Sequence, residues 1–221
     1  MLLAVDTSTA QVGLALYDGA QVIAEYMWRS SQRHTVELAP AISELMTRCG
    51  LTMNEVRALG VALGPGSFTS LRVGLSLAKG VSLSRRVPLI GIPTLDILAA
   101  AQPSARLPLA AVVQAGRGRL AVGWYKSSRK GWQAKGPARV VTVEALAEEI
   151  ESPSIVCGEL TSEDREQLEN NPDVHLVSPA QSARRPAVLA ELAWVRWQKG
   201  EVDDDASLAP IYLHTVEPIP A

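Results

Sequence analysis

The chain contains 221 residues, of which 47% are hydrophobic and 20% are charged. This composition excludes an intrinsically disordered protein, and the length allows one large domain or two small ones. The formal net charge of −2 argues against a protein that binds nucleic acid over its whole surface.

The cysteines and the apolar segments indicate the cellular compartment of the protein. Cys49 and Cys157 lie far apart without a C-x-x-C spacing, which fits a reducing cytoplasm better than a disulfide-bonded secreted domain. The N-terminal stretch MLLAVDTSTA has no basic region and reaches Asp6 too early for a signal peptide. A run of about 18 apolar residues is also missing. We therefore expect a soluble, cytoplasmic protein without a membrane partner.

The first half predicts an alternating pattern that begins with three strands. Asp18-Gly19 is a hairpin turn between the second and third strands, and the helices are indicated by apolar residues three and four positions apart. The expected strands are 2–6, 12–17, 21–28, 56–64 and 88–92, and the expected helices are 35–48, about 68–83 and 94–101. The element order is βββαβαβα.

The second half repeats this order less clearly. Gln102-Pro103-Ser104 separates two apolar runs, so we expect lobes at 1–103 and 104–221. The expected strands are 109–115, 119–127, 132–142, 154–158 and 174–178, and the expected helices are 143–150, 162–170 and 185–198. The pattern predicts an α/β protein of two duplicated βββαβαβα lobes with mixed sheets.

The stretch GPGSFTSLRVGLSLAKG, residues 64 to 80, has features of a phosphate-binding loop. It lacks the Lys-Ser/Thr pair of a P-loop, and Thr69 stands where a dinucleotide-binding motif has its third glycine. Ser67, Thr69 and the free N–H groups of a helix start remain able to hold an anion. The alternative is a tight turn at Gly64 and Gly66 with Ser67 as the helix N-cap.

Small residues recur every four positions along the following helix, at Ser70, Gly74, Ala78 and Ser82. A glycine inside a helix costs about 1 kcal/mol relative to alanine, so Gly74 indicates close packing at that point. The neighbour is either the helix at 35–48 of the same chain or a second protein. The spacing does not decide between them.

Candidate catalytic groups are few. Asp6 ends the first strand, where many phosphotransferases hold a magnesium carboxylate, but the matching residue of the second lobe is the uncharged Gln114. The alternative for Asp6 is a turn acceptor for the N–H groups of residues 7–9. The histidines His34, His175 and His214 are scattered, and His34 has Leu38 one turn later instead of another ligand. We therefore predict no catalytic residue and no metal site.

Charge is segregated in the second half. Between Gln114 and Arg139 there are seven Lys or Arg residues and no acid, interleaved with Trp124, Tyr125 and Trp132. From Glu144 to Asp173 there are ten acids and one arginine. The basic stretch is either an RNA contact, for which Arg129 and Lys130 are the candidates, or one of two complementary solvated faces.

The motifs together resemble the TsaB (YeaZ) family, which acts in bacterial biosynthesis of the threonylcarbamoyladenosine beside the anticodon of tRNA. The resemblance rests on VDTSTAQVGLALYDG, H-T-x-E-L-x-P-x-I, GPGSFTSLRVGLSLAKG and IGIPTLD, and covers roughly residues 1 to 100. Beyond them, PIYLH (210–214) stands where the family tends to end in P-x-Y-L-R.

The resemblance implies an actin/Hsp70/sugar-kinase-like fold and a non-catalytic partner of the related transferase TsaD. It implies docking through N-terminal-lobe helices, a homodimer through the same surface when alone, and assembly with the ATPase TsaE on tRNA. Cofactors are then expected only in the partner proteins, as ATP and metal. TsaD carries a metal-binding histidine pair, and here His34 lacks the second histidine at Leu38.

This chain departs from the family at two motifs. Ser70 replaces a usual glycine, and VVQAGRGRLAVGWY replaces a usual D-A-R-x-G-E-V-Y, so that Gln114 and Ala121 stand in place of two acids. The rival hypothesis is an ATP-using enzyme of the sugar-kinase class, in which Asp6, Thr7, Ser67 and Thr69 form a phosphate loop that is vestigial if the protein is a scaffold.

We expect the docking interface on the helices at 35–48 and 68–83. Its candidate residues are Leu38, Ala41, Leu45, Ser70, Gly74, Leu77, Ala78 and Val81. On this hypothesis, Gly74→Leu leaves the monomer folded and abolishes pairing.

Overall fold

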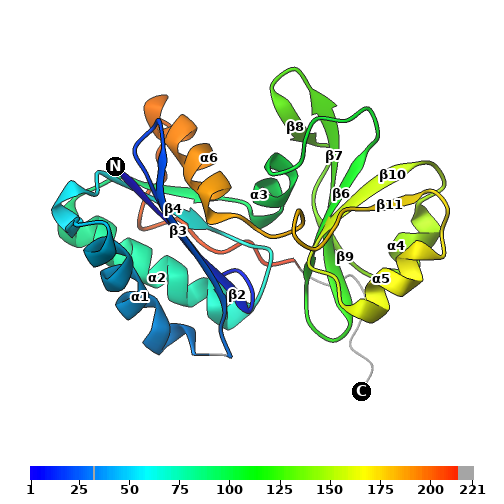
Figure 1. The fold of residues 1–221 in the computed structure, drawn as a ribbon, viewed down its shortest axis with the longest axis horizontal. Helices are drawn as coiled ribbons and strands as arrows, with labels where there is room; N and C mark the ends of the chain where they lie inside the picture. The colour runs from blue at the N-terminus through cyan, green and yellow to red at the C-terminus, as the bar shows by residue number, and fades with distance from the viewer. Residues whose placement is uncertain (32, 214–221) are drawn as a thin grey trace. The chain divides into compact units, whose positions relative to one another are not determined.

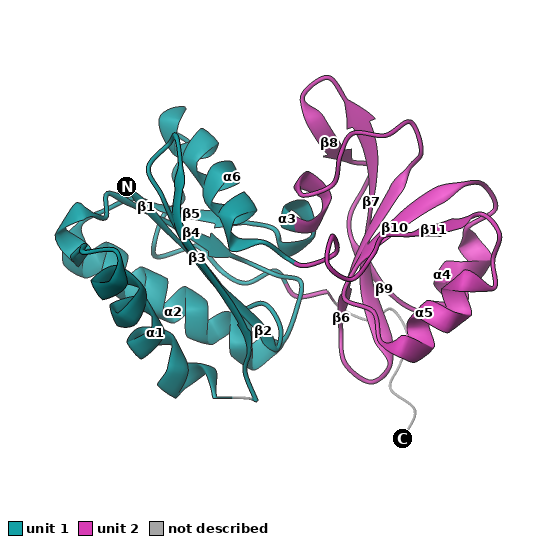
Figure 2. Ribbon diagram, viewed as in Figure 1, with its two compact units in different colours: residues 1–97, 184–211 teal, residues 98–183, 212–221 magenta. Residues whose placement is uncertain are grey.

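The computed structural model describes residues 1–31 and 33–213, which form two compact units. Figure 2 colours the first unit, residues 1–97 and 184–211, in teal and the second, which begins with residues 98–183, in magenta. This division differs from the predicted lobes at 1–103 and 104–221 in two ways. The first segment ends at residue 97, and the chain returns to the first unit at residue 184.

The first unit is built on a mixed five-stranded sheet. Its order is β3-β2-β1-β4-β5, with β1, β2 and β3 antiparallel and β1, β4 and β5 parallel. The strands are β1 (Leu2–Asp6), β2 (Gln11–Tyr17), β3 (Val22–Arg29), β4 (Ala58–Ala62) and β5 (Leu89–Ile92). All residues of β1, β4 and β5 are buried, as expected for strands covered on both faces.

Helices cover both faces of this sheet (Figure 1). Helices α1 (His34–Arg48) and α2 (Phe68–Arg85) pack on the face that carries Leu3 and Val5. Helix α6 (Pro186–Gln198) packs on the opposite face, where Ala193 meets Gly60 so closely that a Cβ on Gly60 would lie 2.8 Å from its methyl carbon. The remaining elements are the 3-10 turn Met53–Glu55 and α3 (Thr94–Ala100).

The predicted order βββαβαβα is confirmed in the first unit, but the last helix lies elsewhere than predicted. We expected 185–198 in the second lobe, whereas α6 packs on β1, β2 and β4 of the first. The physical reason is the small apolar face of α6, since Ala190 and Ala193 fit flat against the buried alanines of that sheet.

The second unit has its own mixed sheet in the order β11-β10-β6-β7-β8, with β9 also paired to β7. The strands are β6 (Leu109–Gln114), β7 (Arg119–Ser128), β8 (Gly131–Ala134), β9 (Arg139–Thr142), β10 (Ser154–Gly158) and β11 (Val174–Leu176), and the helices are α4 (Val143–Glu149) and α5 (Ser162–Glu169). The predicted strand 132–142 is therefore two strands. Gly136-Pro137 interrupts it, because proline has no N–H for a sheet ladder.

The small residues of α2 face the interior of the first unit and not a partner. Ser70, Gly74, Ala78 and Ser82 are all buried. The hydroxyl of Thr7 donates to the carbonyl of Ser70 at 2.7 Å, and a Cβ on Gly74 would lie 2.3 Å from that hydroxyl oxygen. The close neighbour predicted from Gly74 is thus the turn after β1 of the same chain.

Five of the eight predicted interface residues are consequently not available for docking. Leu38 and Leu45 are at most 1% exposed, and Ser70, Gly74 and Ala78 lie on the buried side of α2. Ala41, Leu77 and Val81 are partly exposed. Helix α2 has a second row of small residues at Ser76, Gly80 and Ser84, and spacing alone does not say which row meets the sheet.

Among residues 1–31 and 33–213, none of the helices has the length and apolar character needed to span a membrane.

The first prediction compares two glycines of α2, of which Gly74 is buried and Gly80 is exposed. Gly80 has open space where a Cβ would stand, so Gly80→Ala is expected to raise the free energy of unfolding by about 1 kcal/mol through helix propensity. Gly74→Ala is expected to lower it by about 1–3 kcal/mol, because its methyl group overpacks against Thr7. Gly74→Leu is then expected to disrupt folding.

Urea denaturation of the two alanine variants measures the difference. Equal stabilisation by both would contradict the inward orientation of Gly74.

Candidate functional site

The 64–69 loop is a helix start held against residues 7–10, the segment that connects β1 to β2. Ser67 is the N-cap of α2, as the cap interpretation predicts, and its side chain accepts from the N–H of Ser70. The N–H of Ser67 itself donates to the carbonyl of Ser8 at 2.7 Å. A Cβ on Gly66 would lie 2.0 Å from that carbonyl oxygen, so only glycine fits there. The side chains of Ser67 and Thr69 are exposed.

Asp6 is paired with a buried arginine that sequence reasoning missed. Arg184 Nε lies 2.5 Å from Asp6 Oδ2, and both side chains are 1% exposed. The guanidinium also donates to the hydroxyl of Thr9 at 3.1 Å and to the carbonyl of Gln11 at 2.9 Å. The guanidinium cation of Arg184 therefore stands beside the Asp6 carboxylate, which is the group that the magnesium hypothesis requires as a metal ligand.

The second oxygen of Asp6 serves the turn, as the alternative interpretation predicts. Oδ1 accepts the N–H of Ser8 at 2.9 Å. The hydroxyl of Ser8 lies 2.7 Å from that of Thr94, which in turn accepts the N–H of Gly64. Asp6, the first turn and the 64–69 loop thus form one hydrogen-bonded network. No sequence signal close to Asp6 points to Arg184, because the two residues are 178 positions apart.

His34 has a structural contact. It is buried at the start of α1, and its Nε2 lies 3.0 Å from the carbonyl oxygen of Thr9. Within the part of the chain that the structure describes, no three His, Cys, Asp or Glu side chains are grouped as a metal would require. His214 lies outside the described residues.

An apolar groove of about 330 Å³ lies between α1 and α2, beside the segment that follows α1. Leu77 and Val81 line it, as two of the predicted interface residues, and the wall from α1 is formed by Ile42 and Met46. The other lining residues are Leu3, Ala39, Ser43, Thr47, Leu51, Thr52 and Met53. This groove is the candidate docking surface.

Exposed apolar side chains continue on the same two helices. Leu83 is 67% exposed and Val36 is 59% exposed. Phe68, at the start of α2, is 53% exposed and carries the guanidinium of Arg72 at 3.7 Å from its ring centroid. Gly80 lies between Leu77 and Leu83 on α2, and a Cβ at this position would meet no other atom within 4 Å.

The basic residues of the second unit are spread over several places. Arg129 and Lys130 are exposed in the turn between β7 and β8. Tyr125 is buried in the core, and the indole N–H of Trp132 donates to the carbonyl of Gln102 at 3.0 Å. Gln114, at the position of a missing family acid, donates to Asp164 Oδ2 at 2.8 Å.

The second prediction concerns Arg184. Arg184→Met leaves the Asp6 carboxylate buried without its cation, so we expect the free energy of unfolding to fall by about 3–5 kcal/mol. Arg185→Met is the matched control, because the Arg185 side chain is 53% exposed and its ion pair with Glu25 is expected to matter by at most about 1 kcal/mol. Denaturant unfolding measures both, and equal losses would contradict a special role for Arg184.

The chain is similar to proteins of tRNA modification over most of its length. The family model described as tRNA N6-adenosine threonylcarbamoyltransferase, TsaD, matches residues 28–190. The tRNA threonylcarbamoyladenosine biosynthesis protein TsaB of Bacillus subtilis is 29% identical over 98% of this chain and 95% of its own.

Solved structures identify the fold. YeaZ from Pseudomonas aeruginosa superimposes with a TM-score of 0.80 at 24% identity, covering 96% of this chain and 99% of its own. Component A of the (R)-2-hydroxyglutaryl-CoA dehydratase of Acidaminococcus fermentans gives a TM-score of 0.52 at 11% identity, over 90% and 98% of the two chains. The predicted actin/Hsp70/sugar-kinase-like fold is confirmed. By its fold and near full-length similarity, the chain belongs to the TsaB (YeaZ) family of tRNA threonylcarbamoyladenosine biosynthesis proteins.

Proposed function

We propose that this protein is a non-catalytic subunit of the threonylcarbamoyladenosine modification complex that docks a TsaD-like paralogue through α1 and α2. The observation that carries the proposal is the apolar groove between these helices together with the exposed side chains beside it. Exposed apolar surface of this kind marks interaction sites on soluble proteins.

Gly80 supports α2 as the element that meets the partner. A glycine inside a helix is unfavourable by about 1 kcal/mol, and the described residues of this chain place nothing near Gly80 to justify it. A partner backbone approaching α2 closely provides the reason, because interaxial distance depends on the side chains at the contact. Leu77 and Val81, four positions apart on one face of α2, supply apolar area beside this approach.

The surroundings of Asp6 support a non-catalytic role. Its two oxygens are engaged by Arg184 and by the N–H of Ser8, inside a network that holds the turn. The ATP-using alternative needs this carboxylate for a cation, and no observation favours it. ATP and metal then enter through the partners, a TsaD-like transferase and a TsaE-like ATPase.

We infer that the isolated protein forms a homodimer through the same surface. In a dimer with a two-fold axis the same patch lies on both subunits, so the helices α1 and α2 of two copies would face one another. A TsaD-like paralogue with the same helices competes for this surface, so the homodimer and the heterodimer exclude one another.

The third prediction tests this surface with two kinds of change. Leu77→Glu places a charge in the groove. Gly80→Leu fills the open space beside α2 with a side chain that favours the helix, so that a loss of binding is not a loss of helix stability. Each is expected to weaken binding to the TsaD-like protein at least 30-fold, which corresponds to the roughly 2 kcal/mol of an interface hot spot. Titration calorimetry measures the affinity, and size-exclusion chromatography measures homodimerisation.

Val195→Glu on α6 is the matched control, because this valine is 51% exposed and lies on the other face of the sheet. It is expected to bind normally. Undiminished binding by Gly80→Leu and Leu77→Glu would refute the docking proposal.

A further inference from the structure

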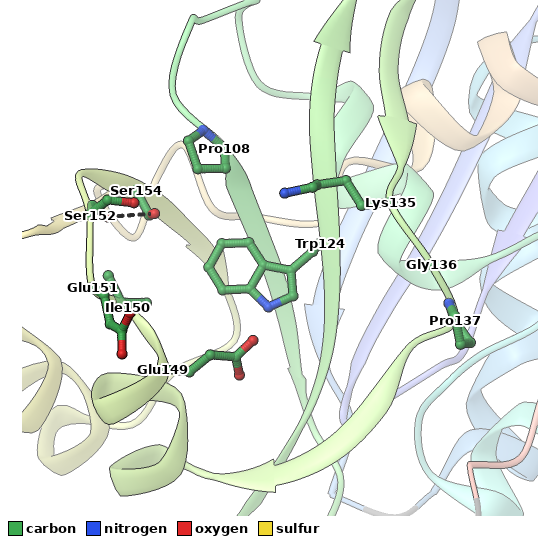
Figure 3. Close-up of a pocket in the computed structure, with 10 residues that line it drawn as sticks. All are labelled: Pro108, Trp124, Lys135, Gly136, Pro137, Glu149, Ile150, Glu151, Ser152 and Ser154. Carbon is green, nitrogen blue, oxygen red and sulfur yellow. Dashed lines mark hydrogen bonds between the residues drawn. The ribbon is translucent and has the colours of Figure 1, made fainter.

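A polar hollow of about 340 Å³ lies at one end of the second unit's sheet, with Trp124 at its centre (Figure 3). Lys135 approaches the indole from one side, whereas Glu149 and Glu151 approach from other sides. The remaining lining residues are Pro108, Gly136, Pro137, Ile150, Ser152 and Ser154.

A second hollow of about 470 Å³ adjoins the first, since Pro108 and Lys135 line both. Three cations line it: Arg106, Lys126 and Lys135. Its other lining residues are Ala105, Leu107, Pro108 and Ser127, so that it contains no acidic side chain.

The strand geometry brings these cations to the aromatic ring. Trp124 and Lys126 are two positions apart in β7, so they lie on one face of the sheet. The N–H of Lys135 donates to the carbonyl of Trp124 at 2.7 Å, which fixes Lys135 beside it. Leu109 pairs with Tyr125, and Arg106 therefore precedes β6 at the same end of the sheet.

The positive charge of the second hollow, at Arg106, Lys126 and Lys135, is not neutralised by the described residues of the protein. In residues 1–31 and 33–213, no hydrogen bond or ion pair engages the side chains of Arg106, Lys126 or Lys135. The sequence has no acid from 97 to 143. Of the two glutamates in the first hollow, Glu149 is engaged by Arg139, which leaves Glu151 on the far wall.

Trp124 adds an aromatic surface beside this charge. Its ring is partly exposed, and its Nε1 has no hydrogen-bond partner among the described residues. Unpaired RNA bases stack on aromatic rings, while Lys and Arg side chains contact the phosphates of the same strand.

We propose that these two adjoining hollows bind single-stranded RNA, with a phosphodiester at Arg106, Lys126 and Lys135 and an unpaired base on Trp124. The proposal deepens the proposed function, on which it rests for the choice of RNA as the anion. It moves the RNA contact that the sequence left as one alternative away from Arg129 and Lys130, which stand in an exposed turn and line neither hollow.

The fourth prediction uses the full chain without any partner and a fluorescently labelled tRNA transcript that has adenosine beside its anticodon. The variant Arg106→Gln/Lys126→Gln/Lys135→Gln is expected to bind more than tenfold more weakly at about 0.1 M salt. The slope of log affinity against log salt is expected to fall by about 2, because each lost phosphate contact on a single strand contributes about 0.7.

The matched control is Arg117→Gln/Arg129→Gln/Lys130→Gln, which removes the same charge from exposed turns of the same stretch. It is expected to keep its affinity within about threefold. Trp124→Leu is expected to lose about tenfold and Trp124→Phe to retain binding, because stacking needs the ring and not the indole N–H. Thermal unfolding confirms that each variant is folded.

Several outcomes would overturn the proposal. Equal losses of tRNA affinity in the two triple variants would show that only the total positive charge matters and not the hollows. Unchanged tRNA affinity in the Arg106/Lys126/Lys135 variant would show that these side chains do not contact the RNA. Displacement of tRNA by micromolar AMP would assign the hollows to a free nucleotide instead. Because no partner is present, these results do not depend on the docking prediction, and Leu77→Glu should bind tRNA normally.

Discussion

The buried ion pair between Asp6 and Arg184 joins the two distant segments that build the first unit. Arg184 begins the return of the chain, and Pro186 of α6 lies so close to Gly13 that a Cβ there would meet its ring at 3.0 Å. Glu25 accepts the N–H of Ala187 and so caps the same helix. Because an unpaired charge is costly in the interior, the turn after β1 and the start of α6 must be placed together.

The same turn sets the orientation of α2. Thr7 bonds to Ser70 and fills the space at Gly74, so the small residues of the helix face inward. Leu77, Gly80 and Val81 are then left on the outward side beside α1. The hydrogen-bonded network around Thr7 therefore determines which side of α2 faces the solvent.

The candidate sites were predicted in part. Periodicity identified α1 and α2 as the helices of interest, and Leu77 and Val81 do line the groove. Residues such as Gly74 and Ala78 have the same small size as an interface would need, and only their contacts assign them to the interior. In the second unit the basic stretch was visible, but strand pairing selects Lys126 and Lys135 as the cations beside Trp124.

The sequence by itself determined the order of strands and helices in the first half, the cap at Ser67 and the family, because these depend on local spacing and on long distinctive motifs. Only the tertiary structure decided where α6 packs, which cation meets Asp6 and which face of α2 is free. These are contacts between residues far apart in the chain, such as Asp6 and Arg184, and local patterns carry no information about which distant segment will supply the partner.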